Sequence, residues 1–100
     1  MLKIDLSDND LQQHSNEIQS YFNLYVGALA DEFSTPCFRL KRETGPDKHT
    51  MYKARFQSNR RAGRAIEVEI KSKQAKAAIE LCFARARRTL LREHRIAALG

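Results

Sequence analysis

Basic side chains gather on the last third of the chain, where their spacing suits the binding of a polyanion. A helix predicted over about residues 72–97 carries seven bases against two acids, Glu80 and Glu93. At 100° per residue, four of its arginines fall within an arc of about 80°; these are Arg85, Arg88, Arg92 and Arg95, and the other bases of the helix are Lys73, Lys76 and Arg87. Guanidinium groups match phosphate oxygens through paired hydrogen bonds, so this arc predicts a phosphate-binding face.

The opposite side of the same predicted helix is apolar. Its stripe consists of Ala75, Ile79, Cys82, Phe83, Ala86 and Leu90. One face can therefore enter a core while the other is exposed. The alternative is a basic face that only meets solvent, although solvated helices usually mix Glu and Lys at i, i+4 spacing. Leu81 and Leu91 lie off the stripe near the arginines, either as partner contacts or as scattered surface residues.

Two further basic groups are candidate RNA contacts. The first is a turn-rich segment with Arg60, Arg61 and Arg64, whose alternative interpretation is a solvated hairpin turn. The second occupies alternate positions of two predicted strands and comprises Arg39, Lys41, Lys53 and Arg55. Glu67 and Glu69 on the next strand can neutralise part of this second group through cross-strand pairs, which would make it a structural surface.

The elements that position these groups follow from hydrophobic periodicity. Residues 2–6 alternate as a strand, and Ser7 with Asp10 resembles a capping box for the helix that follows. That helix begins between Asn9 and Asn16 and ends near Glu32, where Ser34-Thr35-Pro36 stops it. Period-two runs around Phe38–Leu40, Tyr52–Phe56 and Ile66–Ile70 predict three strands joined by short turns, as in an antiparallel meander. We therefore expect an α+β two-layer sandwich of order β-α-β-β-β-α, with a four-stranded sheet and both helices on one face.

Composition narrows the class of protein. One hundred residues predict a single domain over residues 1–100, with a net charge of +6. Residues 1–32 hold one of the 18 basic residues and six of the 12 acids, so the positive charge is concentrated in the rest of the chain. This polarity favours nucleic acid as the partner. A membrane surface is not expected, because the basic helix has no bulky aromatic anchor apart from Phe83 on its apolar side, and no small-molecule substrate is expected. No signal segment or spanning run is seen, which predicts a soluble cytoplasmic protein.

Residues typical of catalysis or metal binding are sparse. Cys37 and Cys82 are interpreted as reduced packing residues. His14, His49 and His94 have no ligand-like spacing with them, so we expect no metal site. With four glycines there is no phosphate-cradling or dinucleotide motif, and no nucleophile is paired with a base. The sequence thus predicts a non-enzymatic protein without a cofactor.

The strand order and several segments resemble the ribosome hibernation-promoting factor and ribosome-associated inhibitor family, in its short form. The segments are Phe38-Arg39-Leu40-Lys41-Arg42, Met51-Tyr52-Lys53-Ala54-Arg55-Phe56, Ile66-Glu67-Val68, Ala78-Ile79 and Arg87-Arg88-Thr89-Leu90-Leu91. The resemblance covers nearly the whole chain in topology and about 60 residues in pattern. The acidic N-terminal segment and the arginine-rich turn at Arg60 depart from the family pattern.

This resemblance implies a factor that binds the small ribosomal subunit. Members of the family lie in the cleft of messenger and transfer RNA, against ribosomal RNA, and silence translation during hibernation or stress. Bases of the last helix and neighbouring strands touch the phosphate backbone, which here corresponds to the helix bases from Lys73 to Arg95. The resemblance also implies a monomer off the ribosome.

A second resemblance is to the double-stranded-RNA-binding domain, whose order is α-β-β-β-α. Gly45-Pro46-Asp47-Lys48-His49 is similar to its minor-groove loop, and Ser72-Lys73-Gln74-Ala75-Lys76 to its phosphate-binding helix start. Lys48 between Asp and His, acids in place of glycines before the Ser-Lys pair, and the extra first strand depart from that pattern. A third possibility is a module whose basic face binds an acidic protein.

Overall fold

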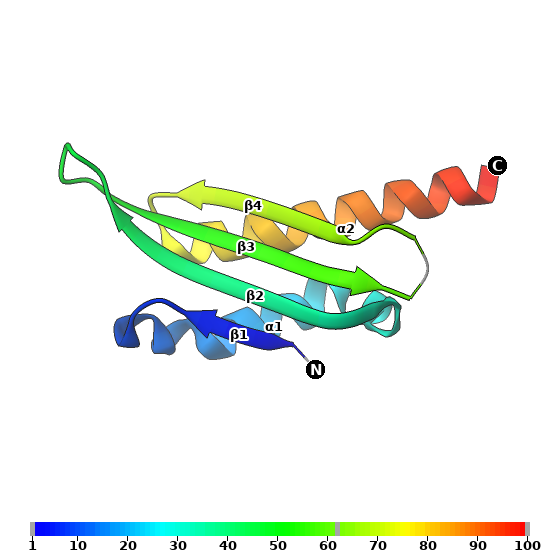
Figure 1. Ribbon diagram of the computed structural model, residues 1–100, viewed down its shortest axis with the longest axis horizontal. Coiled ribbons are helices and arrows are strands. Elements are labelled where there is room, and N and C mark those ends of the chain that lie inside the picture. The colour runs from blue at the N-terminus through cyan, green and yellow to red at the C-terminus, as the bar shows by residue number, and fades with distance from the viewer. Residues whose placement is uncertain (1, 62, 100) are drawn as a thin grey trace.

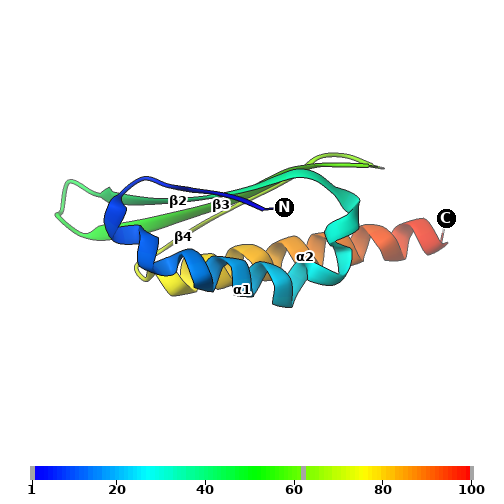
Figure 2. The same ribbon diagram turned by 90° about the horizontal axis from the view of Figure 1, so that it is seen from below.

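The computed structural model describes residues 2–61 and 63–99, with the backbone alone over residues 94–99. Within these residues the order of long elements is β-α-β-β-β-α, and a short 3₁₀ helix flanks each end of the first long helix. Figures 1 and 2 show two layers, with both helices covering one face of the sheet and the opposite face uncovered. The predicted fold class is confirmed, including the side on which both helices lie.

The sheet contains β1 (Lys3–Leu6), β2 (Phe33–Thr44), β3 (Thr50–Arg60) and β4 (Ile66–Ser72), in that spatial order. β1 runs parallel to β2, whereas β2, β3 and β4 form the antiparallel meander that the short turns predict. The register places Arg39 opposite Arg55 and Arg55 opposite Glu69. Because side chains alternate between faces, these charged residues share the uncovered face.

The helices are α1 (Ser15–Val26) and α2 (Ala75–Leu99), with 3₁₀ helices η1 (Asn9–His14) and η2 (Gly27–Glu32) around α1. The expected helix between residues 9 and 32 is therefore divided into three pieces, and it ends at Glu32 as expected. The Ser7 capping box is not formed, since η1 has no side-chain cap and the Ser7 hydroxyl accepts a hydrogen bond from the Arg42 backbone N–H at 3.3 Å. Ser7 thus joins β1 to β2 instead of starting a helix.

The start of β2 differs from the sequence expectation. Ser34, Thr35 and Pro36 lie inside the strand, which begins at Phe33 and pairs with β3 across a register shift between Ser34 and Cys37. Thr35 has a φ of 58°, in the left-handed region that a β-branched residue rarely adopts. Pro36 lacks an N–H, so a bulge at this point accommodates it without losing a ladder bond. The segment that the sequence predicts to stop the helix thus forms an irregularity inside β2.

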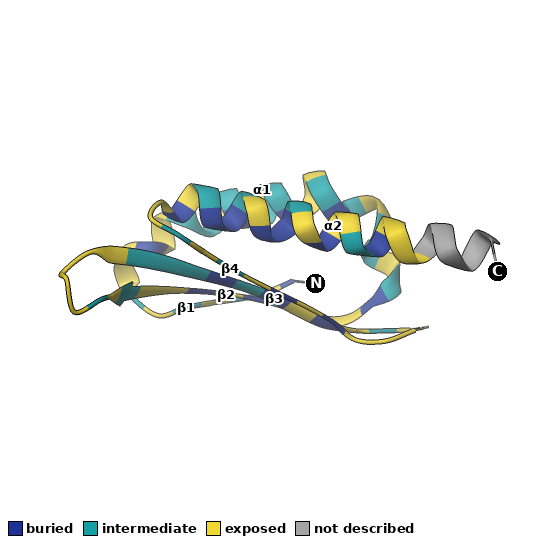
Figure 3. Cartoon of the chain, turned by 90° about the horizontal axis from the view of Figure 1, so that it is seen from above, coloured by how far each residue is buried: buried dark blue, intermediate teal, exposed yellow. Residues whose placement is uncertain are grey.

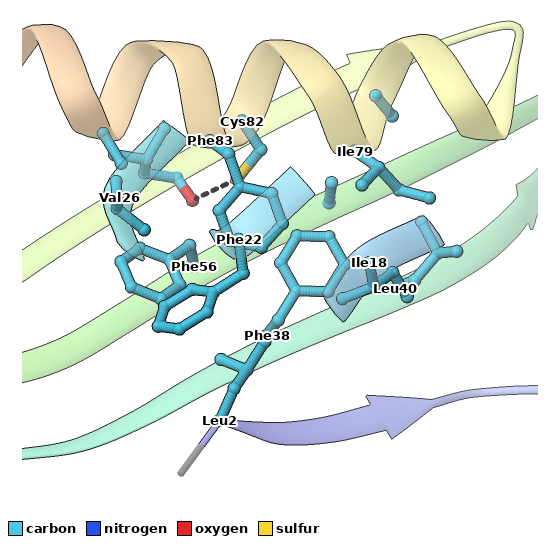
Figure 4. Close-up of a cluster of buried hydrophobic side chains, with 14 of the residues drawn as sticks. Leu2, Ile18, Phe22, Val26, Phe38, Leu40, Phe56, Ile79, Cys82 and Phe83 are labelled. Atoms are coloured by element: carbon cyan, nitrogen blue, oxygen red, sulfur yellow. Dashed lines mark hydrogen bonds between the residues drawn. The ribbon is translucent and has the colours of Figure 1, made fainter. Parts of the chain in front are cut away.

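The core lies between the sheet and the two helices (Figure 3). The whole apolar stripe of α2 is buried, as the periodicity predicts. Phe38 of β2 stacks on Phe83 of α2 with ring centroids 4.9 Å apart, and Phe22 of α1 meets the same ring at 5.9 Å (Figure 4). Fully burying each such ring contributes about 2–3 kcal/mol, so this aromatic cluster fixes α2 firmly on the sheet.

Candidate nucleic-acid interface

The exposed flank of α2 beside β4 carries three arginines, Arg85, Arg88 and Arg92, which we term the β4-side ridge. All three are exposed, and none forms an ion pair with another residue in the described part of the chain. Arg85 and Arg88 line a hollow together with Ile70 of β4, which places the ridge on the β4 side of the helix. Cations without carboxylate partners retain their full charge for an external anion.

The other predicted bases of α2 do not belong to this ridge. Helical periodicity turns Lys76 and Arg87 about 140° away from it, toward α1. Arg87 lies close enough to Tyr25 of α1 to lower the pKa of its hydroxyl, against a larger upward shift of that pKa caused by the hydrogen bond to Glu80. Lys73 precedes the helix, and the side chain of Arg95 lies outside the described residues. The bases of α2 whose side chains are described therefore lie on two flanks and at the helix start.

Both described acids of α2 are bound by groups from outside the helix. Glu80 accepts a hydrogen bond from the Tyr25 hydroxyl at 2.9 Å. Glu93 forms an ion pair with Arg60, from the end of β3. Neither carboxylate is held by a ridge arginine, which explains how a helix that contains acids keeps its basic flank unneutralised.

The uncovered sheet face is basic in sequence but paired in structure. Arg39 contacts Asp5 of β1 at 3.1 Å, Lys53 contacts Glu69 at 3.1 Å, and Arg55 bonds Glu67. Lys41 has no ion pair recorded within residues 2–61 and 63–93. The cross-strand pairs that the glutamates of β4 suggested are therefore present on this face.

The acidic N-terminal segment also neutralises bases of the sheet. Asp8 and Asp10 lie 3.2 and 3.5 Å from the Arg42 guanidinium, beside the Asp5–Arg39 pair. The carboxylates of residues 1–32 thus reduce the positive charge near β1 and β2. The opposite sheet edge, at β4, has no such acidic neighbour strand in the described chain.

The arginine-rich turn after β3 divides into one structural and two exposed residues. The Arg60 side chain is only 7% exposed, is bound by Glu93, and donates to the Arg64 carbonyl at 3.5 Å. A side chain at Gly63, whose φ is +97°, would meet the Arg60 guanidinium at 3.4 Å, so glycine allows this close approach. Arg61 and Arg64 are exposed. Arg60 does not differ from its neighbours in any sequence pattern, and only its contacts in the fold set it apart.

The cysteines and histidines whose side chains are described, a set that leaves out His94, do not assemble a site. Burial raises the pKa of the Cys82 thiol to about 12, as expected of a packing residue. Cys37 is a free cysteine that is half-buried on the uncovered sheet face beside Arg39 and Arg55, whereas Cys82 lies in the core. Among the described residues no three His, Cys, Asp or Glu side chains are grouped to hold a metal.

Leu81, for which the sequence leaves open a partner contact or a scattered surface residue, lies near the ridge. Leu81 is 53% exposed and lines the hollow of about 110 Å³ between α2 and β4, with Ile70 and Ala84. Leu91, 45% exposed, does not line it, and Leu24 of α1 is exposed on the other helix. Helical periodicity places Leu81 off the core stripe. The hollow that Leu81 lines exists because β4 lies beside α2, which periodicity does not show.

Comparison with solved structures places this geometry in a known fold. A ribosomal subunit interface protein from Coxiella burnetii matches with a TM-score of 0.72 over 94% of this chain and 97% of its own, at 12% identity. The N-terminal domain of Protein Y from Thermus thermophilus matches with a TM-score of 0.54 over 90% of this chain and 93% of its own, at 13% identity. At these identities the shared property is the fold.

Comparison of the sequence itself gives no match. Neither the protein-family models nor the curated proteins contain one. No helix within the described residues is long and apolar enough to span a bilayer. The chain thus has an α+β fold shared with a ribosomal subunit interface protein and the Protein Y N-terminal domain, and its last helix bears a basic flank without ion pairs among the described residues.

Proposed function

We propose that this chain is a non-enzymatic, ribosome-associated factor that binds ribosomal RNA of the small subunit in the decoding cleft. Bound there, it inhibits translation during hibernation or stress, as a single cytoplasmic domain over residues 1–100 that is monomeric off the ribosome. The observation that carries the proposal is the β4-side ridge, whose cations lack carboxylate partners in the described chain. The fold is shared with a ribosomal subunit interface protein, which supports the same partner.

Unpaired arginines favour RNA because binding releases counterions from the phosphate backbone. Each phosphate contact contributes to a steep loss of affinity as salt rises. The paired bases of the sheet face gain less, since they must exchange an internal carboxylate for the phosphate. Phosphate contacts fix position on the RNA, whereas preference for one RNA requires contacts to its bases or shape.

The test is co-sedimentation with small subunits after charge reversal of Arg88→Glu with Arg92→Glu. We expect the double variant to lose co-sedimentation and to keep its circular dichroism spectrum and melting temperature, because both side chains are exposed. The matched control is Lys3→Glu with Arg39→Glu, which changes the net charge equally at exposed positions of the sheet, where Arg39 is already paired with Asp5. Retained co-sedimentation of the ridge variant, or equal loss in both variants, would contradict the proposal.

A second candidate is a general duplex-RNA-binding domain. The β2–β3 hairpin tip and the start of α2 lie toward the same end of the molecule (Figure 1), as minor-groove and phosphate-binding elements would require. However, the Ser72 hydroxyl already accepts a hydrogen bond from the Gln74 N–H at 3.2 Å, and Asp47 accepts one from the His49 N–H. The Ser72 hydroxyl keeps its own proton to donate to a phosphate, so these bonds restrict the two segments without excluding RNA.

Titration with a plain RNA duplex separates the two candidates. The first predicts weak binding to the duplex and a strong preference for small subunits, and the second predicts tight binding without that preference. Reversing Lys73 and Lys76 should abolish duplex binding only if the helix start is the site. Association that survives nuclease treatment would instead indicate an acidic protein partner.

A further inference from the structure

The hollow beside the β4-side ridge is an apolar recess among unpaired cations. Ile70 of β4 and Leu81 and Ala84 of α2 form its apolar lining, and Arg85 and Arg88 complete it. Leu81 is 53% exposed. Its apolar surface therefore remains in contact with water, which is unfavourable, and contributes little to the core. The recess therefore has the composition of a small-molecule or base subsite, with an apolar interior and few charged groups at its margin.

The size of the recess limits what can enter it. Its volume is about 110 Å³, and an apolar cavity of about 150 Å³ in another protein accommodates benzene. Part of a single planar ring can therefore enter the recess, whereas a base-paired RNA duplex is too wide to enter it. The flanking arginines require that such a ring be attached to negative charge.

We infer that the recess between α2 and β4 receives one unpaired nucleobase of the RNA bound by the ridge. Arg85 and Arg88 bind the phosphates on its two sides, and Leu81 with Ile70 contacts the face of the base. The inference rests on the proposed RNA-binding function and adds a preference for RNA with an unstacked base, since recognition of specific RNA uses splayed bases in loops and bulges.

β4 adds hydrogen-bonding groups beside the recess. In the described sheet it is an edge strand, paired with β3 alone. An edge strand presents backbone N–H and C=O groups that no neighbouring strand satisfies. Such groups can bond the polar edge of a base whose face lies on Leu81. An acidic extended peptide could also use this edge, but three unpaired arginines in a row favour the denser charge of RNA.

The experiment compares two RNA hairpins that differ by one bulged 2-aminopurine. The variant is Leu81→Ala, and Leu91→Ala is its matched control because Leu91 is similarly exposed on α2 and lies outside the recess. Alanine keeps helix propensity, so neither change should unfold the protein. For the wild type we expect tighter binding of the bulged hairpin and a rise of 2-aminopurine fluorescence as the base leaves the RNA stack.

Leu81→Ala should weaken binding of the bulged hairpin by about five- to tenfold, from the lost apolar contact. It should leave the paired hairpin and the salt dependence unchanged, and Leu91→Ala should resemble the wild type. Equal losses on both hairpins, no loss, or the same loss in Leu91→Ala would overturn the inference. Binding of an alternating Glu-Val peptide that is lost in Leu81→Ala while RNA binding persists would overturn it in favour of a protein ligand.

The ridge variant keeps this test separate from the proposed function. Arg88→Glu with Arg92→Glu should abolish binding of both hairpins if the ridge binds RNA. Loss in the ridge variant combined with no effect of Leu81→Ala leaves the proposed function standing and removes the base subsite. Unchanged binding in the ridge variant removes both.

Discussion

The β4-side ridge and the uncovered sheet face are both rich in bases, yet they differ in what surrounds those bases. On the sheet face Arg39, Lys53 and Arg55 each have a carboxylate partner on a neighbouring strand. On the ridge the arginines have none among the described side chains, because Glu80 and Glu93 are bound elsewhere. Availability for an external anion therefore depends on pairing, and a count of bases does not reveal it.

The pairing follows from geometry. In a sheet, residues opposite or diagonal to one another lie within reach, so strands with Arg and Lys beside a strand with Glu become paired. On a helix only residues three or four apart meet on the surface, and the ridge arginines have no acid at that spacing on their own flank. The same composition thus gives a neutralised face on one element and a basic one on the other.

Removing the basic side chains from each of the two regions should give the largest difference in RNA affinity between variants. Replacing Arg85, Arg88 and Arg92 with alanine should weaken binding of structured RNA about a hundredfold and lower the slope of log affinity against log salt by about 2 to 3. The equivalent change at Arg39, Lys53 and Arg55 should reduce affinity by less than about threefold, since those bases are already paired. Filter binding at several salt concentrations measures both, and equal slopes for the two variants would remove the distinction.

Arg60 is the exception within the basic turn, because its side chain is buried against Gly63 and bound by Glu93. Arg60→Ala should lower the free energy of unfolding by about 2 kcal/mol, since it leaves the Glu93 carboxylate without its partner. Arg64→Ala, in the same turn but exposed, should change it by less than about 0.5 kcal/mol. Urea unfolding provides the comparison, and similar values for the two variants would show that Arg60 is an ordinary surface residue.

The fold was predictable because its signals are local. Alternation in β2, β3 and β4 and the apolar stripe from Ala75 to Leu90 each specify an element and its buried face, and two amphipathic helices with a one-faced sheet leave few ways to pack. The start of β2 was not predictable, because a helix stop and a bulged strand share the Ser-Thr-Pro pattern. Only tertiary pairing with β3 decides between them.

The sequence shows which basic residues the candidate site contains, but it does not show which of them lack a carboxylate partner. Periodicity grouped Arg85, Arg88 and Arg92 correctly, since one helix fixes their relation. Periodicity also turns Arg87 away from them, but it could not show that Arg60 is held by an acid 33 residues away. The carboxylate partners and the recess at Leu81 depend on which elements pack together. A single sequence does not show this packing.

Removing acids should convert the sheet face toward the behaviour of the ridge. Glu67→Gln with Glu69→Gln frees Arg55 and Lys53, so we expect RNA affinity to rise about threefold, with a stability change below about 1 kcal/mol because the pairs are exposed. The control is Glu17→Gln with Asp31→Gln, which gives the same gain of charge in the helix layer. If both pairs of substitutions raise affinity equally, net charge alone explains the effect and the local release of cations does not.

The Tyr25–Glu80 hydrogen bond should have the smallest effect, and it tests why an acid of α2 leaves the bases free. Tyr25→Phe should lower the melting temperature slightly near neutral pH, since the hydrogen bond from its hydroxyl to Glu80 is lost. Tyr21→Phe is the control, because no hydrogen bond of its hydroxyl is recorded within the described chain.

The bond to Glu80 raises the pKa of Tyr25 above its usual value of 10.0 in the folded state. The stabilisation is therefore complete below the ordinary tyrosine pKa and is lost as pH rises through the raised one. The stability difference between wild type and Tyr25→Phe should consequently shrink above pH 10, which thermal melts in alkaline buffers can follow. A difference that stays constant across this range would show that the hydroxyl contributes through packing, and Glu80 would then be available to the bases of its own helix.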